Sequence, residues 1–241
     1  MKRISLPEAE PAVFSWGVES SRDTAFLADL GVRAIFQEVE RGQEAEVLES
    51  LVDVDVYLLT GSPDMGLAEM CAEIERAAEG FNGVVFDIEP YGQAGWAEAD
   101  ARTQILDDFC DAVESAYDYA CDRGVEMLLC VPYWYDELGY DEQLERLVGN
   151  CDGVCVMNYD RGHEAENVAG EAELAVRYQR RLWTIYELSP ADGESVQACN
   201  TYFGQGLAAV LENYRANFSD TDIALAYHDI DHLRALVERE N

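Results

Sequence analysis

The chain repeats one alternation eight times, and this alternation restricts its fold more than any other feature. Short runs of β-branched and aromatic residues alternate with longer helical patterns at a mean spacing of about 30 residues, without a low-complexity linker. This rhythm is typical of parallel sheets whose strands are joined by helices. The predicted strands are residues 12–19, 32–38, 54–60, 83–89, 125–133, 153–159, 182–187 and 223–228.

Eight such units predict a closed (βα)8 TIM barrel, an α/β fold, as a single domain over residues 1–241. The typical size of that barrel is ~250 residues, and the chain has 241. The alternative is a doubly wound open sheet, since periodicity alone does not prove closure. A glycine-rich dinucleotide loop after the first strand would favour that alternative, but Gly17-Val18-Glu19 lacks the further glycines.

Helical patterns fill the gaps between the predicted strands. Ser20 and Asp23 form a possible capping box for the first helix, which Gly31 ends. Shorter patterns cover residues 42–51, 67–78, 141–148, 171–181, 207–216 and 232–239. The clearest helix ends at Gly124, and its apolar positions recur every four residues, at Ile105, Phe109, Val113, Tyr117 and Cys121.

The charge balance excludes several partners. Asp and Glu number 49 against 16 Lys and Arg, which gives a formal net charge of −33. Nucleic acids, anionic membranes and polyphosphates would therefore meet a repulsive field. The first residues contain no apolar run typical of a signal peptide, and no segment has the ~18 apolar residues needed to cross a bilayer. We expect a cytoplasmic protein that binds neither nucleic acid nor membrane.

The seven cysteines occur in apolar contexts without a Cys-x-x-Cys pair. They are predicted to be reduced core residues, as expected in the cytoplasm. Cys151 and Cys155, four residues apart, are the one candidate for zinc, but no second pair of cysteines or histidines accompanies them. We therefore predict no metal site and no cofactor.

Polar residues gather at the carboxyl ends of the predicted strands, where barrel enzymes build their active sites. Single acids that follow strands are commonly helix N-caps, and we assign that role to Asp64, Asp136 and Asp160. The full set of polar strand-end residues is Glu19, Gln37, Glu38, Glu40, Ser62, Asp64, Asp87, Glu89, Tyr133, Trp134, Asp136, Asn158, Tyr159, Asp160, Glu187, His228 and Asp229.

Asp87 and Glu89 differ from the other acids because they end an apolar run. Strand alternation directs Val85, Asp87 and Glu89 to one face, into the barrel mouth. Burial and mutual repulsion should raise the pKa of at least one carboxyl, which suits a general acid. The alternative is a structural ion pair with an arginine, and Arg161 is the one arginine near a predicted strand end.

The segment Phe81-Asn82-Gly83-Val84-Val85-Phe86-Asp87-Ile88-Glu89 resembles the fourth-strand signature of the chitinase-like glycoside hydrolases of family 18. Met157-Asn158-Tyr159-Asp160 is similar to the family's sixth-strand motif. The resemblance implies that Glu89 protonates the glycosidic oxygen while Asp87 positions the substrate's N-acetyl group, which attacks the anomeric carbon. It also implies that Tyr159 holds the acetamido oxygen.

Val85 departs from that signature, since the family has an acid there. The chain more closely resembles uncharacterised bacterial barrels related to the family. They share Glu89-Pro90-Tyr91 followed by Trp96, Pro-Tyr-Trp-Tyr-Asp at 132–136, Glu187 on the seventh strand, and a last strand that ends in His228-Asp229.

Aromatic residues at the strand ends suit a sugar site, because the apolar faces of sugars stack on such rings, although single rings also simply fill barrels. The strand-end aromatic residues are Trp16, Tyr91, Trp96, Tyr133, Trp134, Tyr159, Tyr186 and Tyr227. The predicted substrate-binding residues are Glu187, His228, Trp134, Tyr133, Asn158, Tyr91 and Trp16.

The function expected first is hydrolysis of a small, N-acetylated saccharide, with Glu89, Asp87 and Tyr159 as the catalytic residues. If the substrate lacks an acetamido group, Glu187 becomes the candidate nucleophile. Two alternatives stay open. One is a Mg²⁺- or Mn²⁺-dependent isomerase or hydrolase that uses Asp87, Glu89, Glu187 and His228 as ligands. The other is a barrel that binds a saccharide or a protein without turnover.

Overall fold

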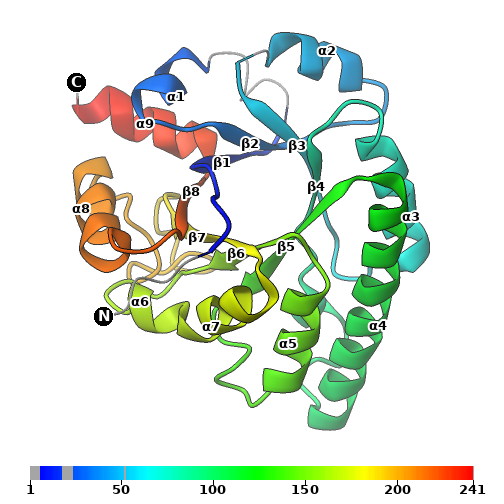
Figure 1. Cartoon of the computed structure of the whole chain (residues 1–241). Coiled ribbons are helices and arrows are strands. Elements are labelled where there is room, and N and C mark those ends of the chain that lie inside the picture. The colour runs from blue at the N-terminus through cyan, green and yellow to red at the C-terminus, as the bar shows by residue number, and fades with distance from the viewer. Residues whose placement is uncertain (1–5, 18–23, 52, 241) are drawn as a thin grey trace.

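The computed structural model describes residues 6–17, 24–51 and 53–240. Its strands close into a parallel barrel in the order of the sequence, with helices around the outside (Figure 1). β1 pairs with β8, with Ala12 opposite Ala226 and Val13 opposite Tyr227. This last pairing closes the barrel, so the predicted (βα)8 fold is confirmed and the open sheet is excluded.

All eight predicted strands are present, most of them shorter than expected. β4 ends at Phe86, so that Asp87 and Glu89 follow the strand directly. The predicted residues 18 and 19 of the first strand lie outside the described residues. The strands are β1 Ala12–Ser15, β2 Ala34–Glu38, β3 Asp55–Thr60, β4 Gly83–Phe86, β5 Glu126–Pro132, β6 Gly153–Met157, β7 Arg181–Glu187 and β8 Ala224–His228.

The predicted helices are also present, while the capping box at Ser20 and Asp23 lies outside the described residues. A short helix, α6, precedes α7 and was not expected. The helices are α1 Ala25–Asp29, α2 Glu44–Ser50, α3 Leu67–Ala77, α4 Ala99–Arg123, α5 Asp141–Gly149, α6 Glu164–Asn167, α7 Ala169–Tyr178, α8 Leu207–Phe218 and α9 Ile230–Glu240, with a 3-10 turn, η1, at Pro90–Gly92. No helix in the described ranges is long and apolar enough to cross a membrane.

The apolar face of α4 differs from the predicted one. Phe109 and Val113 are buried, but Cys121 is exposed. A step of four residues exceeds the helical repeat of 3.6, so positions chosen at that step turn gradually toward solvent. The side chains that α4 buries against the barrel follow steps of three and four, at Leu106, Phe109, Cys110, Val113, Ala116 and Ala120.

The barrel interior is filled by side chains and forms no pore. Phe36 makes edge-to-face contacts with Tyr57 and Trp183, whose ring centroids lie 5.7 and 5.8 Å away. Trp183 is 1% exposed, and its indole N–H donates to the Glu10 carbonyl at 2.7 Å. Gly153 makes room for this indole, because a Cβ there would lie 2.7 Å from Trp183 Cζ3. Because side chains fill the interior, we expect a site at the carboxyl ends of the strands, where barrels of this kind build their active sites.

The three predicted N-cap acids do not occupy N-cap positions. α3 begins after Gly66, α5 after Tyr140 and α6 after His163, so Asp64, Asp136 and Asp160 each lie a few residues earlier. Each loop between strand and helix is longer than the direct junction that the prediction assumed. These three assignments were wrong.

All seven cysteines are free. Cys110, Cys130, Cys151 and Cys155 are buried, Cys71 is half-buried, and Cys121 and Cys199 are exposed. Burial raises the pKa of Cys110 and Cys151 to about 12, which keeps both thiols protonated.

We expect thiol titration to distinguish the two exposed cysteines from the other five. In the native, unreduced protein, Cys121 and Cys199 should react within minutes, because a thiol-specific reagent needs an accessible thiolate. After denaturation without reductant, the count should rise to seven. A denatured count of five or fewer would contradict the free thiols of the structure.

Candidate active site

Side chains from five segments meet at the carboxyl end of the barrel. The interior cluster contains Val85, while Val84, Phe86 and Ile88 pack in the outer layer. Continued alternation past the end of β4 would direct Asp87 and Glu89 toward the mouth. The other residues at this mouth are Tyr159 after β6, Glu187 on β7, His228 on β8 and Trp16 after β1.

The backbone holds Asp87 firmly. Its N–H donates to the Thr60 carbonyl at 2.9 Å, which continues the pairing of β3 with β4. Gly61 approaches so closely that a Cβ there would lie 1.9 Å from the Asp87 carbonyl oxygen. Any residue other than glycine at position 61 would push the two strand ends apart.

The Asp87 carboxyl is poised to titrate near neutral pH. Burial, followed by the charge of Glu89, raises the pKa of Asp87 to about 6, while His228 acts in the opposite direction. Its Oδ1 is buried without a hydrogen-bond partner in the described part of the chain. Such an unpaired oxygen is free to accept a hydrogen bond from a ligand.

Glu89 ends the segment and is the N-cap of the 3-10 turn η1, whose first residue is Pro90. The Tyr91 hydroxyl donates to Glu89 Oε1. This leaves Oε2 to hold a proton or a ligand. Burial, together with the hydrogen bond to Glu89, raises the pKa of Tyr91 far above its ordinary value, so Tyr91 stays a donor.

Glu187 and His228 form a pair at the ends of β7 and β8. Glu187 Oε2 lies 3.0 Å from His228 Nδ1, and Oε1 accepts a hydrogen bond from the Ser189 N–H at 2.6 Å. Burial would raise the pKa of Glu187, but His228 and Ser189 outweigh it and lower the pKa. Glu187 is therefore an ionised carboxylate with both oxygens engaged.

Trp16 fixes the other side of the His228 ring. Its indole N–H donates to His228 Nε2 at 3.2 Å. Because Nε2 accepts this bond, the ring carries a proton on Nδ1, the nitrogen that lies near Glu187. Burial would lower the pKa of His228, but the nearby carboxylates, Glu187 above all, raise it overall.

Tyr159 lies between these groups. Its ring packs against the interior cluster, with its centroid 6.1 Å from that of His228. Burial, then the charges of Glu187 and Asp87, raises the pKa of Tyr159 well above its ordinary value. The phenol therefore keeps its proton and is a hydrogen-bond donor toward the mouth.

An aromatic wall stands beside Glu89. Trp134 lies 5.3 Å from Tyr91, 6.2 Å from Trp96 and 5.1 Å from Tyr135, measured between ring centroids. Tyr91 and Trp134, both predicted as substrate-binding residues, are thus brought together next to a candidate acid. Tyr133 is half-buried outside this wall, and burial and the charge of Asp160 raise its pKa.

Asn158 is not at the mouth. It follows Met157, which faces the interior, so Asn158 faces the outer layer. There its side-chain amide donates to the Glu164 carbonyl and to Thr184 Oγ1, and its Oδ1 accepts from Asn167. These bonds occupy the side chain fully and make it a structural link to α6.

Two of the strand-end aromatic residues also face outward. Tyr186 and Tyr227 belong to the outer hydrophobic layer, and the Tyr186 hydroxyl donates to Asn213 Oδ1 at 2.6 Å. Arg161, the alternative ion-pair partner of the acids, instead bonds the Thr201 carbonyl at 2.8 Å and Gln205. No arginine contacts Asp87 or Glu89 within the described ranges.

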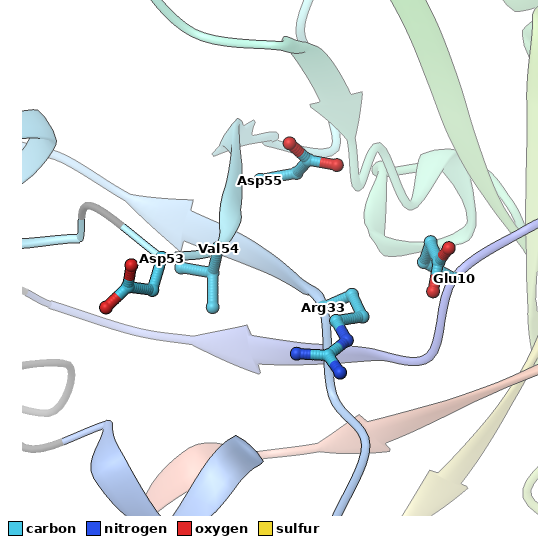
Figure 2. Close-up of a pocket in the computed structure, with 5 residues that line it drawn as sticks. All are labelled: Glu10, Arg33, Asp53, Val54 and Asp55. Atoms are coloured by element: carbon cyan, nitrogen blue, oxygen red, sulfur yellow. The ribbon is translucent and has the colours of Figure 1, made fainter.

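A separate cavity of about 360 Å³ lies at the opposite end of the barrel. Glu10, Arg33, Asp53, Val54 and Asp55 line it, and they precede or begin the first three strands. Figure 2 shows the Arg33 side chain between Glu10 on one side and Asp53 on the other. This cavity lies far from the carboxyl ends of the strands and has no part in the candidate site.

Among the described residues, no three His, Cys, Asp or Glu side chains gather as potential ligands of a metal ion. The sequence interpretation missed Cys130, which lies beside Asp87, on the interior face of β5. That interpretation treated Cys130 as an ordinary core residue, although strand parity and sheet register could have placed it next to Asp87.

The fold and the position of this mouth define a (βα)8 barrel with a candidate active site at its carboxyl end, and comparison with solved structures agrees with the fold. Ega3 of Aspergillus fumigatus, solved in complex with galactosamine, superposes with a TM-score of 0.58 at 11% identity, and the match covers 94% of both chains. A chitinase from Chromobacterium violaceum superposes with a TM-score of 0.57 at 12% identity, and the match covers 96% of this chain and 98% of the other. The PgaB glycoside hydrolase domain from Bordetella bronchiseptica superposes with a TM-score of 0.53 at 13% identity, and the match covers 96% of this chain and 97% of the other.

No protein-family model and no curated protein matches the chain. At these identities, the likeness to solved structures concerns the fold alone.

Proposed function

We propose that this chain is a glycoside hydrolase that cleaves a small, N-acetylated saccharide with retention of configuration. The observation behind the proposal is the pair of carboxyls at the mouth: Asp87 is half-buried, with its Oδ1 enclosed and a pKa of about 6, and Glu89 accepts a hydrogen bond from Tyr91. Two carboxyls in unlike surroundings are typical of glycosidases. The similar solved structures include a chitinase and a glycoside hydrolase domain, which supports the same activity.

In the proposed reaction, Glu89 first acts as the acid. Its proton on Oε2 passes to the glycosidic oxygen as the bond to the anomeric carbon breaks, and the leaving sugar departs as an alcohol. The substrate's own acetamido oxygen bonds to the anomeric carbon from the other face. Water then opens this cyclic intermediate and gives a proton to Glu89, which restores the acid.

Asp87 and Tyr159 hold the acetamido group in this scheme. The Asp87 carboxylate accepts the acetamido N–H, which stabilises the positive charge that develops on the ring of the intermediate. The Tyr159 hydroxyl, kept protonated by its surroundings, donates to the acetamido oxygen. The rings of Tyr91, Trp134 and Trp16 offer apolar faces for neighbouring sugars.

The geometry argues against the alternative in which Glu187 is the nucleophile. Its two oxygens are already engaged, by Ser189 and by His228, and a nucleophilic carboxylate needs a free oxygen at the anomeric carbon. Glu187 and His228 fit better as a pair that binds sugar hydroxyls.

A panel of chromogenic glycosides tests the proposal, with matched 2-acetamido and 2-hydroxy sugars at the cleaved position. We expect turnover of the acetamido members and release of the product in the same anomeric form as the substrate, followed by proton NMR. Turnover of only the 2-hydroxy members would contradict the assisted mechanism. Binding of the sugars without turnover would instead identify a non-catalytic saccharide-binding barrel.

A further inference from the structure

The surroundings of the Asp87 side chain provide little polar support from its nearest neighbours. Val85, the residue below it on the same inward face, has only methyl groups. Gly61, on the adjoining segment after β3, has no side chain. The hydrogen bond to Thr60 uses the Asp87 backbone and leaves the carboxyl untouched.

One polar side chain of the neighbouring strand, Cys130 on β5, lies next to the Asp87 side chain. Phe86 pairs with Leu129, so the next positions, Asp87 and Cys130, lie opposite each other at the end of β4 and on β5. Cys130 belongs to the interior cluster and is 2% exposed. The pairing therefore places its thiol next to the Asp87 carboxyl, and each group shifts the pKa of the other.

A second thiol lies directly behind the first. Cys130 pairs with Cys155 on β6, which is also interior and fully buried. The two thiols contact each other. Asp87, Cys130 and Cys155 therefore form a continuous polar row across three adjacent strands in an otherwise apolar interior.

We propose that Cys130 is a positioning residue for the reaction proposed above, on which this inference rests: its thiol donates a hydrogen bond to the Asp87 carboxylate and fixes the direction in which that carboxylate faces the substrate. Cys155 restrains the Cys130 side chain from behind. The row provides a donor at the base of the site that neither Val85 nor Gly61 supplies.

The chemistry of the thiols suits this role and no nucleophilic one. Burial raises the pKa of Cys130 well above its ordinary value, so the thiol stays protonated and can donate. A donor to the charged form of a carboxyl lowers its pKa. Asp87 also interacts electrostatically with Glu89 from its own segment and with His228 from β8, while the neutral phenols of Tyr159 and Tyr91 lie nearby.

Two substitutions at position 130 separate hydrogen bonding from packing. Cys130→Ala removes the donor, so the ionisation of Asp87 and the acidic limb of the kcat/KM profile should move up by about half a pH unit. Cys130→Ser supplies a stronger donor of similar size, so the limb should move down. A residue that only packs would shift the limb in the same direction in both variants, or not at all, and that result would overturn the proposal.

Cys151→Ser is the matched control. Cys151 is also fully buried, but it packs in the outer layer, and its thiol contacts the Val148 carbonyl at 3.6 Å. Cys151→Ser makes the same chemical change away from the mouth, so the acidic limb of the kcat/KM profile should stay in place. Near-ultraviolet circular dichroism of each variant establishes that the core is intact.

A titration that needs no turnover distinguishes this inference from the proposed function. With carbon-13 label in the aspartate carboxyls, NMR follows the ionisation of Asp87, and the signal missing in Asp87→Asn assigns it. Opposite shifts in Cys130→Ala and Cys130→Ser support the thiol contact even if no glycoside is cleaved, in which case the proposed function fails on its own. An Asp87 signal that titrates identically in wild type and both variants would overturn the contact.

Discussion

Glu89→Gln should lower kcat/KM by roughly 10² to 10⁴-fold on a substrate with a poor leaving group, as expected when a general acid is lost. The amide of Gln keeps the size of the side chain and can still accept a hydrogen bond from Tyr91, but it has no acidic proton to transfer to the leaving oxygen. A substrate with an activated aryl leaving group needs little protonation, so the same variant should lose much less activity on it. Initial rates on the two substrates measure this contrast.

Asp87→Asn should behave differently. If the acetamido group is the nucleophile, loss of the carboxylate should slow every acetamido substrate, whatever its leaving group. Glu79→Gln is the matched control for Glu89→Gln, because this exposed carboxyl follows α3 at the opposite end of the barrel. Equal and small losses for both site variants on all substrates would show that Asp87 and Glu89 are structural, and a binding barrel would then explain the mouth better.

The features that the sequence predicted correctly depend on local periodicity. A parallel strand buried on both faces must be apolar throughout, so an acid within such a run indicates a strand end or a site. Parity along the segment from Gly83 then placed Val85 in the interior and Phe86 outside, and it directs Asp87 and Glu89 to the mouth. Eight repeats of the same pattern, with a chain length typical of a barrel, favoured closure, and the pairing of β1 with β8 decides it.

The errors have equally local causes. Asn158 was grouped with the motif around it, although its parity is opposite to that of Met157 and Tyr159 and places it outside the barrel. The face of α4 was extrapolated with a repeat of four, which moved Cys121 from the core to the surface. Both could have been avoided by applying the periods of 2.0 and 3.6 strictly.

Other features depend on contacts between segments distant in the sequence, which no local pattern contains. The 3.0 Å contact between Glu187 and His228 joins two strand ends, and the loop after β7 completes it through Ser189. Likewise, nothing in the sequence of α7 indicates that Glu171 is fully buried near Asp136, a residue of the loop after β5. This second pair of acids has a measurable consequence for stability.

Glu171 is a buried acid without compensation. It is 0% exposed, and neither of its carboxyl oxygens has a hydrogen-bond partner among the described residues. Burial raises the pKa of Glu171 to about 8; the polar backbone of Glu171 itself acts against this, and the charge of Asp136 adds to it. The folded protein therefore holds this proton up to about pH 8, whereas the unfolded chain releases it near pH 4.5.

Between these two values the folded state binds more protons than the unfolded state, so stability is greatest at low pH and falls as the pH rises. The slope is about 1.4 kcal/mol per pH unit for a group of this kind. Glu171→Gln removes the titration and keeps the shape. Relative to wild type, its free energy of unfolding should therefore increase from pH 5 to pH 8 by roughly 2 to 4 kcal/mol, measured by urea denaturation at each pH.

The control for this prediction is Glu173→Gln, two residues further along α7. Glu173 is exposed and lies 3.4 Å from Arg177, so its carboxylate contributes little to stability. Its unfolding free energy should follow the wild-type curve at every pH. If the Glu171→Gln curve also runs parallel to wild type from pH 5 to pH 8, Glu171 must ionise in the folded protein as readily as in the unfolded chain. The carboxyl would then have to reach water, because ionisation of an acid enclosed without a partner costs several kcal/mol.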